Sequence, residues 1–199
     1  MWWKARLDLP YVFMIGFNKS GTTSLYHFFK SQGIPAIKHD KGRLPLTMLK
    51  NAIGSKKLLR GYDTRYNVFL DLGFFLPGLH FEANQLFRVL DRDYPNSLFI
   101  YNARPMEAWL ESRMNHTAWD GTLFETACQF YNTKDAGEIK SIWRLQRERF
   151  EHDVRAYFKN TDRLLELNIE DRKAPEQVAA FTGFALDAAK WEHRRKTVK

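Results

Sequence analysis

The chain has 199 residues, of which 44% are hydrophobic and 15% aromatic, so residues 1–199 are expected to form one globular domain with a sizeable core. The 31 Lys and Arg residues exceed the 23 Asp and Glu residues, and the formal charge of +8 favours anionic partners such as a nucleotide, a sulfated molecule, nucleic acid or a membrane surface. No apolar stretch approaches the roughly 20 residues that span a bilayer, and Cys128 is the single cysteine, so we expect a soluble, cytoplasmic protein without a membrane span or an internal disulfide.

Short apolar runs predict buried strands at four places along the chain. In chain order these predicted strands cover residues 11–15, 34–38, 98–102 and 164–169. A first helix is predicted over 24–31 and is ended by Gly33. A second helix is marked by apolar residues between Phe81 and Leu90, and it stops before Pro95.

Two further helices precede the last predicted strand. Pro105 suits the first position of a helix, and apolar residues recur at helical spacing from Ile139 to Phe158. Strands that alternate with helices favour a mostly parallel sheet covered on both faces. We therefore expect an α/β fold, a three-layer αβα sandwich with a mostly parallel central sheet.

Polar residues follow three of the predicted strands at the point where each strand ends. These residues are the segment 16–24, the pair His39 and Asp40, and Arg104. Ligands of such sheets bind at the carboxyl ends of the strands, so these residues are expected to converge.

The segment "GFNKSGTTSL", residues 16–25, combines glycines with hydroxyl side chains directly before a predicted helix. A glycine-containing turn at a helix N-terminus presents backbone N–H groups and the positive end of the helix dipole to an anion. The sequence therefore predicts a P-loop-like phosphate-binding loop. It departs from the loop of nucleotide kinases, because Lys19 lies inside the loop and Thr22 and Thr23 stand where Lys and Ser/Thr are expected.

Two features argue against an ATP-using enzyme. The Lys and Ser/Thr of the usual loop are displaced, and the third predicted strand, "LFIYNAR", does not end in the Asp that helps to hold Mg²⁺. A transferred sulfuryl group carries less charge than a phosphoryl group, so it depends less on a metal. A single lysine near the bridging oxygen, here Lys19, could neutralise the leaving group.

The motif "KSGTTSL" resembles the 5′-phosphosulfate loop of the sulfotransferases that use 3′-phosphoadenosine 5′-phosphosulfate (PAPS). The resemblance implies a PAPS enzyme that needs no metal, with adenosine 3′,5′-bisphosphate as a product. It also implies that Lys19 is catalytic. The residues that it implies for binding the 5′-phosphosulfate are Lys19, Ser20, Gly21, Thr22, Thr23 and Ser24.

A second element of the family is an Arg at a strand end followed eight residues later by a Ser. The segment "RPMEAWLES" matches it with Arg104 and Ser112, which by this resemblance hold the 3′-phosphate. The C-terminal segment "WEHRRKT" resembles a basic segment that closes over the nucleotide in relatives. It implies further contacts to the 3′-phosphate from Arg194, Arg195 and Lys196, since guanidinium groups match phosphate oxygens.

Sulfuryl transfer also needs a base that removes the acceptor's proton. In the glycan-modifying branch of the family this residue follows the second strand, where "KHDKGR" offers His39 and Asp40. His39 can accept a proton near neutral pH, whereas Asp40 would need burial or a like charge. Both stay candidates, and Asp63 and Asp71 are secondary ones with turn and capping roles as the simpler explanation.

The sequence thus predicts a PAPS-dependent sulfotransferase acting on an unidentified hydroxyl or amine of a small-molecule or glycan acceptor. Two alternatives come from other classes. A P-loop nucleotide or small-molecule kinase would keep the loop but need Mg²⁺. A nucleic-acid-binding module would use the positive charge, yet the aromatic residues follow amphipathic patterns rather than exposed stacking arrays, so we expect no nucleic acid partner.

Overall fold

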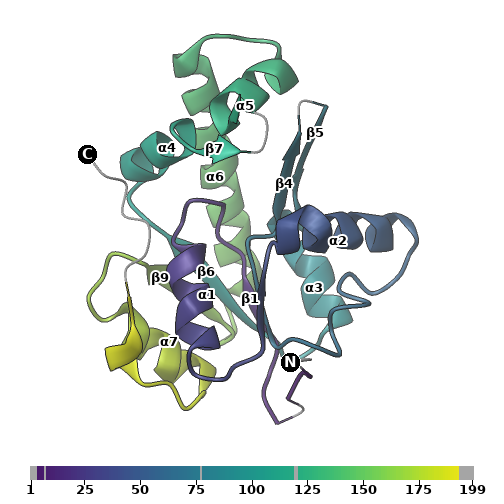
Figure 1. The fold of residues 1–199 in the computed structure, drawn as a ribbon, viewed down its shortest axis with the longest axis vertical. Helices are drawn as coiled ribbons and strands as arrows, with labels where there is room; N and C mark the ends of the chain where they lie inside the picture. The colour runs from purple at the N-terminus through teal and green to yellow at the C-terminus, as the bar shows by residue number, and fades with distance from the viewer. Residues whose placement is uncertain (1–3, 7, 77, 119–120, 193–199) are drawn as a thin grey trace.

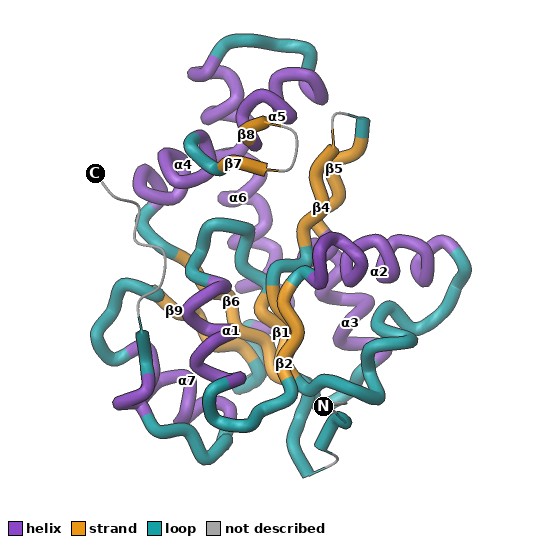
Figure 2. The backbone as a smooth tube through the Cα atoms, viewed as in Figure 1, coloured by secondary structure: helices purple, strands orange, loops and turns teal. Residues whose placement is uncertain are grey.

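The computed structural model describes residues 4–6, 8–76, 78–118 and 121–192, and its centre is a five-stranded sheet (Figures 1 and 2). All strand pairings in this sheet are parallel, and the strand order is β2-β3-β1-β6-β9. The strands are β1 (Val12–Met14), β2 (Ala36–Lys38), β3 (Val68–Leu70), β6 (Leu98–Ala103) and β9 (Leu164–Asn168). The expected α/β class with a parallel central sheet is confirmed.

Helices cover both faces of the sheet because side chains alternate along each strand. Val12 and Met14 of β1 face one apolar cluster, and Phe13 faces the other. The first face is covered by α1 (Thr22–Lys30) and α7 (Ala174–Thr182). The second face carries α2 (Arg43–Ile53), α3 (Phe87–Asp93), α4 (Met106–Met114), α5 (Leu123–Tyr131) and α6 (Ala136–Phe158). The apolar stripe predicted between residues 139 and 158 is the buried side of α6.

Two antiparallel hairpins lie outside the sheet. The larger one, β4 (Gly73–Leu76) and β5 (Leu79–Glu82), continues from the carboxyl end of β3 and stands beside α5 in Figure 1. The smaller one joins β7 (Thr117–Ala118) to β8 (Gly121–Thr122). The described residues also form three 3₁₀ turns, η1 (Asp40–Gly42), η2 (Ala83–Leu86) and η3 (Ala188–Lys190). Within the described ranges, no helix is both long and apolar enough to cross a membrane.

The four predicted strands are confirmed, each to within two residues at either end, but the prediction of the region between them was incomplete. It missed β3, so the segment 98–103 is the fourth strand of the sheet in chain order and not the third. The helix predicted from Phe81 was wrong at its start, because Phe81 lies in β5 and α3 begins only at Phe87. Here the alternating segment before the helix pairs with β4, and tertiary pairing overrides the helical pattern.

The direction of the crossovers places the loop after β1 at a special point of the sheet. From β1 the chain leaves toward α1 on one face, whereas from β3 and β6, the two neighbours of β1, it leaves toward helices on the other face. Adjacent loops that part in this way open a crevice at the carboxyl ends of the strands, where ligands of such sheets bind.

Candidate functional site

The loop that follows β1 is fastened by one side chain of the neighbouring strand. The Oδ1 atom of Asn102, in β6, accepts the Gly16 N–H at 3.2 Å, and its Nδ2 atom donates to the Ser20 carbonyl at 2.7 Å. Asn102 is fully buried. A Cβ atom at Gly16 would lie 1.9 Å from the carbonyl oxygen of Asn102, so this close approach requires glycine. Both ends of the loop are thereby held in one conformation.

The second half of the loop contains two residues with a positive φ, directly before α1 begins at Thr22. Lys19 has a φ of 67°, and Gly21, with a φ of 80°, caps the helix. A Cβ atom at Gly21 would come within 2.5 Å of the Ile169 side chain. Among the described residues, no side chain caps the N-terminus of α1 and its first turn has no acidic residue. The positive end of the helix dipole is therefore not neutralised by a carboxylate of its own first turn.

The hydroxyl side chains expected to bind the anion differ in exposure. Ser20, Thr22 and Ser24 are buried, whereas Thr23 is half-buried. The Thr23 Oγ1 atom accepts a hydrogen bond of 2.8 Å from the Nζ atom of Lys38, the last residue of β2. The structure thus brings a second lysine to the first turn of α1. The signal available in the sequence was a lysine that closes an apolar strand at the edge where ligands bind.

Lys38 also connects this turn to Asp71, which follows β3. The Lys38 Nζ atom lies 4.0 Å from the Asp71 Oδ2 atom, and both side chains are about four-fifths buried, with exposed fractions of 22% and 21%. Within the described part of the chain, no group of three or more His, Cys, Asp or Glu side chains is placed to hold a metal ion. The Lys38 ammonium group contacts the Thr23 hydroxyl and approaches the Asp71 carboxylate. These three residues link the N-terminus of α1 to the carboxyl ends of β2 and β3.

The candidate base His39 stands in an unusual backbone segment. His39, Asp40 and Lys41 have φ values of 55°, 47° and 54°, a left-handed run that side chains other than glycine rarely adopt. The His39 Nδ1 atom accepts the Gly42 N–H at 3.2 Å. The ring is thereby engaged in the turn, so the contact of His39 favours a role in shaping the backbone there.

The other candidate base, Asp40, is fixed by two donors. Its Oδ2 atom accepts the Tyr62 hydroxyl at 2.7 Å, and its Oδ1 atom accepts Arg43 at 2.8 Å. Partial burial alone raises the pKa of Asp40, but the hydrogen bonds from Tyr62 and Arg43 outweigh it and lower the pKa overall. A carboxylate stabilised in this way is a weak base, so the contacts of Asp40 favour a role in shaping the turn.

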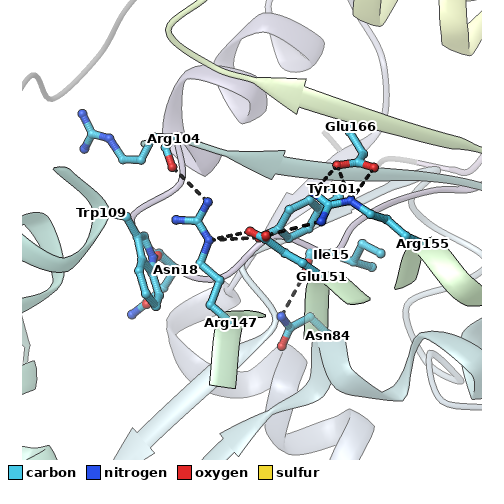
Figure 3. A network of polar contacts seen from close by, with 10 residues as sticks. All are labelled: Ile15, Asn18, Asn84, Tyr101, Arg104, Trp109, Arg147, Glu151, Arg155 and Glu166. Carbon is cyan, nitrogen blue, oxygen red and sulfur yellow. Dashed lines mark hydrogen bonds and ion pairs between the residues drawn. The ribbon is translucent and has the colours of Figure 1, made fainter. Parts of the chain in front are cut away.

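Arg104, expected at the 3′-phosphate, already has an anionic partner. Its Nε and Nη2 atoms donate to the Oε1 atom of Glu170 at 3.1 and 2.8 Å. Figure 3 shows its guanidinium turned away from Arg147, which donates to the Arg104 carbonyl at 3.0 Å. Ser112 is buried in α4. Arg194, Arg195 and Lys196 lie outside the described residues.

A polar network supports the loop from the side of α4 and α6. The Arg147 Nε atom donates to the Tyr101 hydroxyl at 3.1 Å and to Glu151 at 2.8 Å, and burial raises the pKa of Tyr101, so this hydroxyl stays a donor. Two more hydrogen bonds reach the segment after β1, from Trp109 Nε1 to the Asn18 carbonyl at 3.0 Å and from Asn84 Nδ2 to the Ile15 carbonyl at 3.1 Å; all four residues are drawn in Figure 3. Hydrogen bonds from α4 and η2 therefore hold the segment after β1 in addition to those from β6.

A buried ion pair lies between the β4–β5 hairpin and α4. Arg113 donates to Glu82 at 2.7 Å, and the exposed fractions of the two side chains are 1% and 10%. Burial raises the pKa of Glu82, and Arg113 opposes this shift only in part. The Arg113 guanidinium lies 4.7 Å from the ring centre of Trp143 and 5.8 Å from that of Phe17, in the loop. In the sequence both charges look like ordinary surface residues, so the pair was missed.

Comparison of the chain with models of protein families and with curated protein sequences found no match. The arrangement itself shows what the site can do. A preformed backbone turn, a helix N-terminus without an acidic residue in its own first turn among the described residues, and the lysines Lys19 and Lys38 lie at one switch point of the sheet. Such a combination suits the binding of a phosphate-sized anion.

Proposed function

We propose that the protein is a PAPS-dependent sulfotransferase, which moves a sulfuryl group to a hydroxyl or amine of an unidentified acceptor. The observation that carries the proposal is the loop after β1. Its backbone is fixed by Asn102, and it leads into a helix N-terminus that has a lysine contact and, among the described residues, no first-turn acid. The motif "KSGTTSL" in this P-loop-like position supports PAPS as the ligand.

In this proposal the acceptor oxygen or nitrogen attacks sulfur in line with the bond to the bridging oxygen. Negative charge develops on that oxygen as the bond breaks, and Lys19 neutralises it, which takes the place of a metal ion. Arg104 and Ser112 hold the 3′-phosphate, and Arg194, Arg195 and Lys196 are proposed for the same phosphate. Arg104 must then exchange Glu170 for the nucleotide.

A kinase is the second candidate, and one observation favours it. Of the two strands beside β1, β3 is followed directly by Asp71, whereas β6, which contains the segment 98–102, is not followed by an acid. In phosphoryl-transfer enzymes of this type a loop Ser/Thr and a strand-end Asp hold Mg²⁺. Here, however, the Lys38 ammonium contacts Thr23 and approaches Asp71. A cation supplied by the chain at this place favours the metal-free reaction.

Ligand-induced stabilisation separates the candidates. Unfolding of the wild-type chain is followed by thermal shift with adenosine 3′,5′-bisphosphate in EDTA, with ATP and Mg²⁺, and with an oligonucleotide. We expect the bisphosphate alone to raise Tm in EDTA, since a ligand at 100 times its Kd stabilises by about 2.7 kcal/mol. Stabilisation only by ATP with Mg²⁺ would establish the kinase, and stabilisation only by the oligonucleotide would establish the nucleic-acid module.

A further inference from the structure

Asp71 lies at the carboxyl end of β3, at the edge of the sheet where the loop after β1 also lies. It directly follows β3, one of the two strands beside β1, and has a φ of 58°. A left-handed backbone is uncommon outside glycine, and Asp and Asn are among the residues that adopt it most readily. The backbone turn aims its carboxylate toward Lys38, which in turn contacts the first turn of α1.

The surroundings of Asp71 contrast with those of the other carboxylates near the strand ends. Asp40 is held by Tyr62 and Arg43, and Glu82 is buried against Arg113. The contact between Asp71 and the Lys38 ammonium group is longer, at 4.0 Å. Burial raises the pKa of Glu82, Arg113 opposes this shift, and the negative charge of Asp71 adds a smaller upward contribution.

We infer, on the basis of the proposed function, that Asp71 removes the proton of the acceptor and that Lys38 holds the transferred sulfuryl group between Asp71 and Thr23. In the step, the acceptor oxygen forms a bond to sulfur, and its proton passes to the Asp71 carboxylate. The bond from sulfur to the bridging oxygen breaks, and its electron pair leaves with adenosine 3′,5′-bisphosphate. Asp71 afterwards releases the proton to solvent.

Lys19 and the loop keep their proposed roles at the leaving group, and Asp71 acts on the acceptor side of the transferred group. Lys38 contacts Thr23 at the helix N-terminus, where the proposed phosphosulfate lies, and its Nζ atom also lies 4.0 Å from the Asp71 carboxylate. The sulfuryl oxygens are thus next to a cation, and the acceptor oxygen that approaches them meets a carboxylate. His39 and Asp40 keep the turn after β2 in shape.

The test uses PAPS itself with water as the acceptor, in buffer with EDTA so that no metal contributes. Single-turnover cleavage of PAPS is measured for wild type, Asp71→Asn and Asp153→Asn, together with the affinity for adenosine 3′,5′-bisphosphate by calorimetry. Asparagine tolerates a positive φ, so Asp71→Asn keeps the backbone turn. Asp153, half-exposed on α6 beside Arg88, is the matched control for loss of one carboxylate.

We expect Asp71→Asn to slow cleavage by about 10²-fold, the scale of one general base, with nucleotide affinity within about threefold of wild type. Asp153→Asn should match wild type in both. Cleavage by Asp71→Asn at the wild-type rate would overturn the role of Asp71 and leave the proposed function intact. Joint loss of cleavage, affinity and Tm would show a structural role instead. Failure of the wild type to cleave PAPS despite binding the nucleotide would also overturn the assignment, and failure to bind it would overturn the proposed function.

Discussion

The two proposed phosphate sites of the chain are built in opposite ways. The loop after β1 is made of backbone whose contacts to Asn102 are satisfied without any ligand, and the helix it starts has no first-turn acid among the described residues. Arg104, in contrast, offers a side chain whose guanidinium is already paired with Glu170. A backbone site loses little order on binding, whereas a paired side chain must give up one anion to take another.

This difference assigns separate tasks to the two sites. The preformed loop is suited to hold the reacting group in a fixed geometry, where small displacements slow a reaction strongly. The exchangeable Arg104 is suited to discriminate between nucleotides, because its net gain depends on a charge that only some ligands carry. Substitutions in the loop and at Arg104 or Glu170 should therefore have different effects.

Gly16→Ala should have the largest effect, because the added methyl group would disrupt the conformation of the preformed loop. The new Cβ atom would lie 1.9 Å from the Asn102 carbonyl oxygen, which is a backbone atom and cannot move aside as the end of a flexible side chain could. We expect a loss of about 3 kcal/mol or more in the free energy of unfolding, measured with urea. Gly33→Ala is the control, since its Cβ would meet no atom within 4 Å and only its φ of 78° opposes the change. A loss there of about 1 kcal/mol is expected, and equal losses at both glycines would show that the loop is not rigid.

Lys19→Ala tests whether the rigid loop carries the chemistry. Loss of one charge partner at the leaving group should reduce turnover by about 10²-fold, with a smaller loss of nucleotide affinity. Lys56→Ala removes an exposed lysine that lies in the turn after α2, and it should leave both quantities unchanged. Turnover of Lys19→Ala close to that of wild type would place the leaving-group charge on another residue.

The sequence predicted the parts of this site that depend on local pattern. Apolar runs located β1, β2, β6 and β9, and the glycine-containing turn located the loop, because each feature lies within a few residues. The sequence did not reveal β3, whose three buried residues are followed at once by Asp71. A strand this short gains its stability from pairing on both sides with β1 and β2, and that pairing is not visible in its own residues.

Contacts between distant residues account for the rest of what was missed. Asn102 reaches a loop more than eighty residues earlier in the chain, and Arg113 reaches Glu82 across a hairpin that the sequence analysis did not predict. Because β3 was not predicted, Asp71 was not recognised as an acid at the end of a strand next to β1. Placing Asp71 beside Lys38 required the strand order, which composition and periodicity do not determine.

Arg104→Ala tests the exchangeable site. If Arg104 leaves Glu170 for the 3′-phosphate, its loss should weaken adenosine 3′,5′-bisphosphate by about 2 kcal/mol, the range of a charge-assisted hydrogen bond. Binding of adenosine 5′-phosphate, which lacks the 3′-phosphate, should barely change. Calorimetry with both nucleotides decides the matter, and equal weakening of the two would mean that Arg104 supports the loop or the fold.

Glu170→Gln should have the smallest effect and the opposite sign. Glutamine keeps the size of the side chain but removes the charge that competes with the nucleotide for Arg104, at a pair whose exposed fractions are 19% and 40%. Partly exposed pairs of this kind contribute up to about 1 kcal/mol, so the bisphosphate should bind about two- to fivefold more tightly while adenosine 5′-phosphate is unaffected. The gain should vanish in the double variant with Arg104→Ala, because the two residues act through one contact. Weaker binding by Glu170→Gln would instead show that Glu170 positions Arg104, and the second site would then be as preformed as the loop.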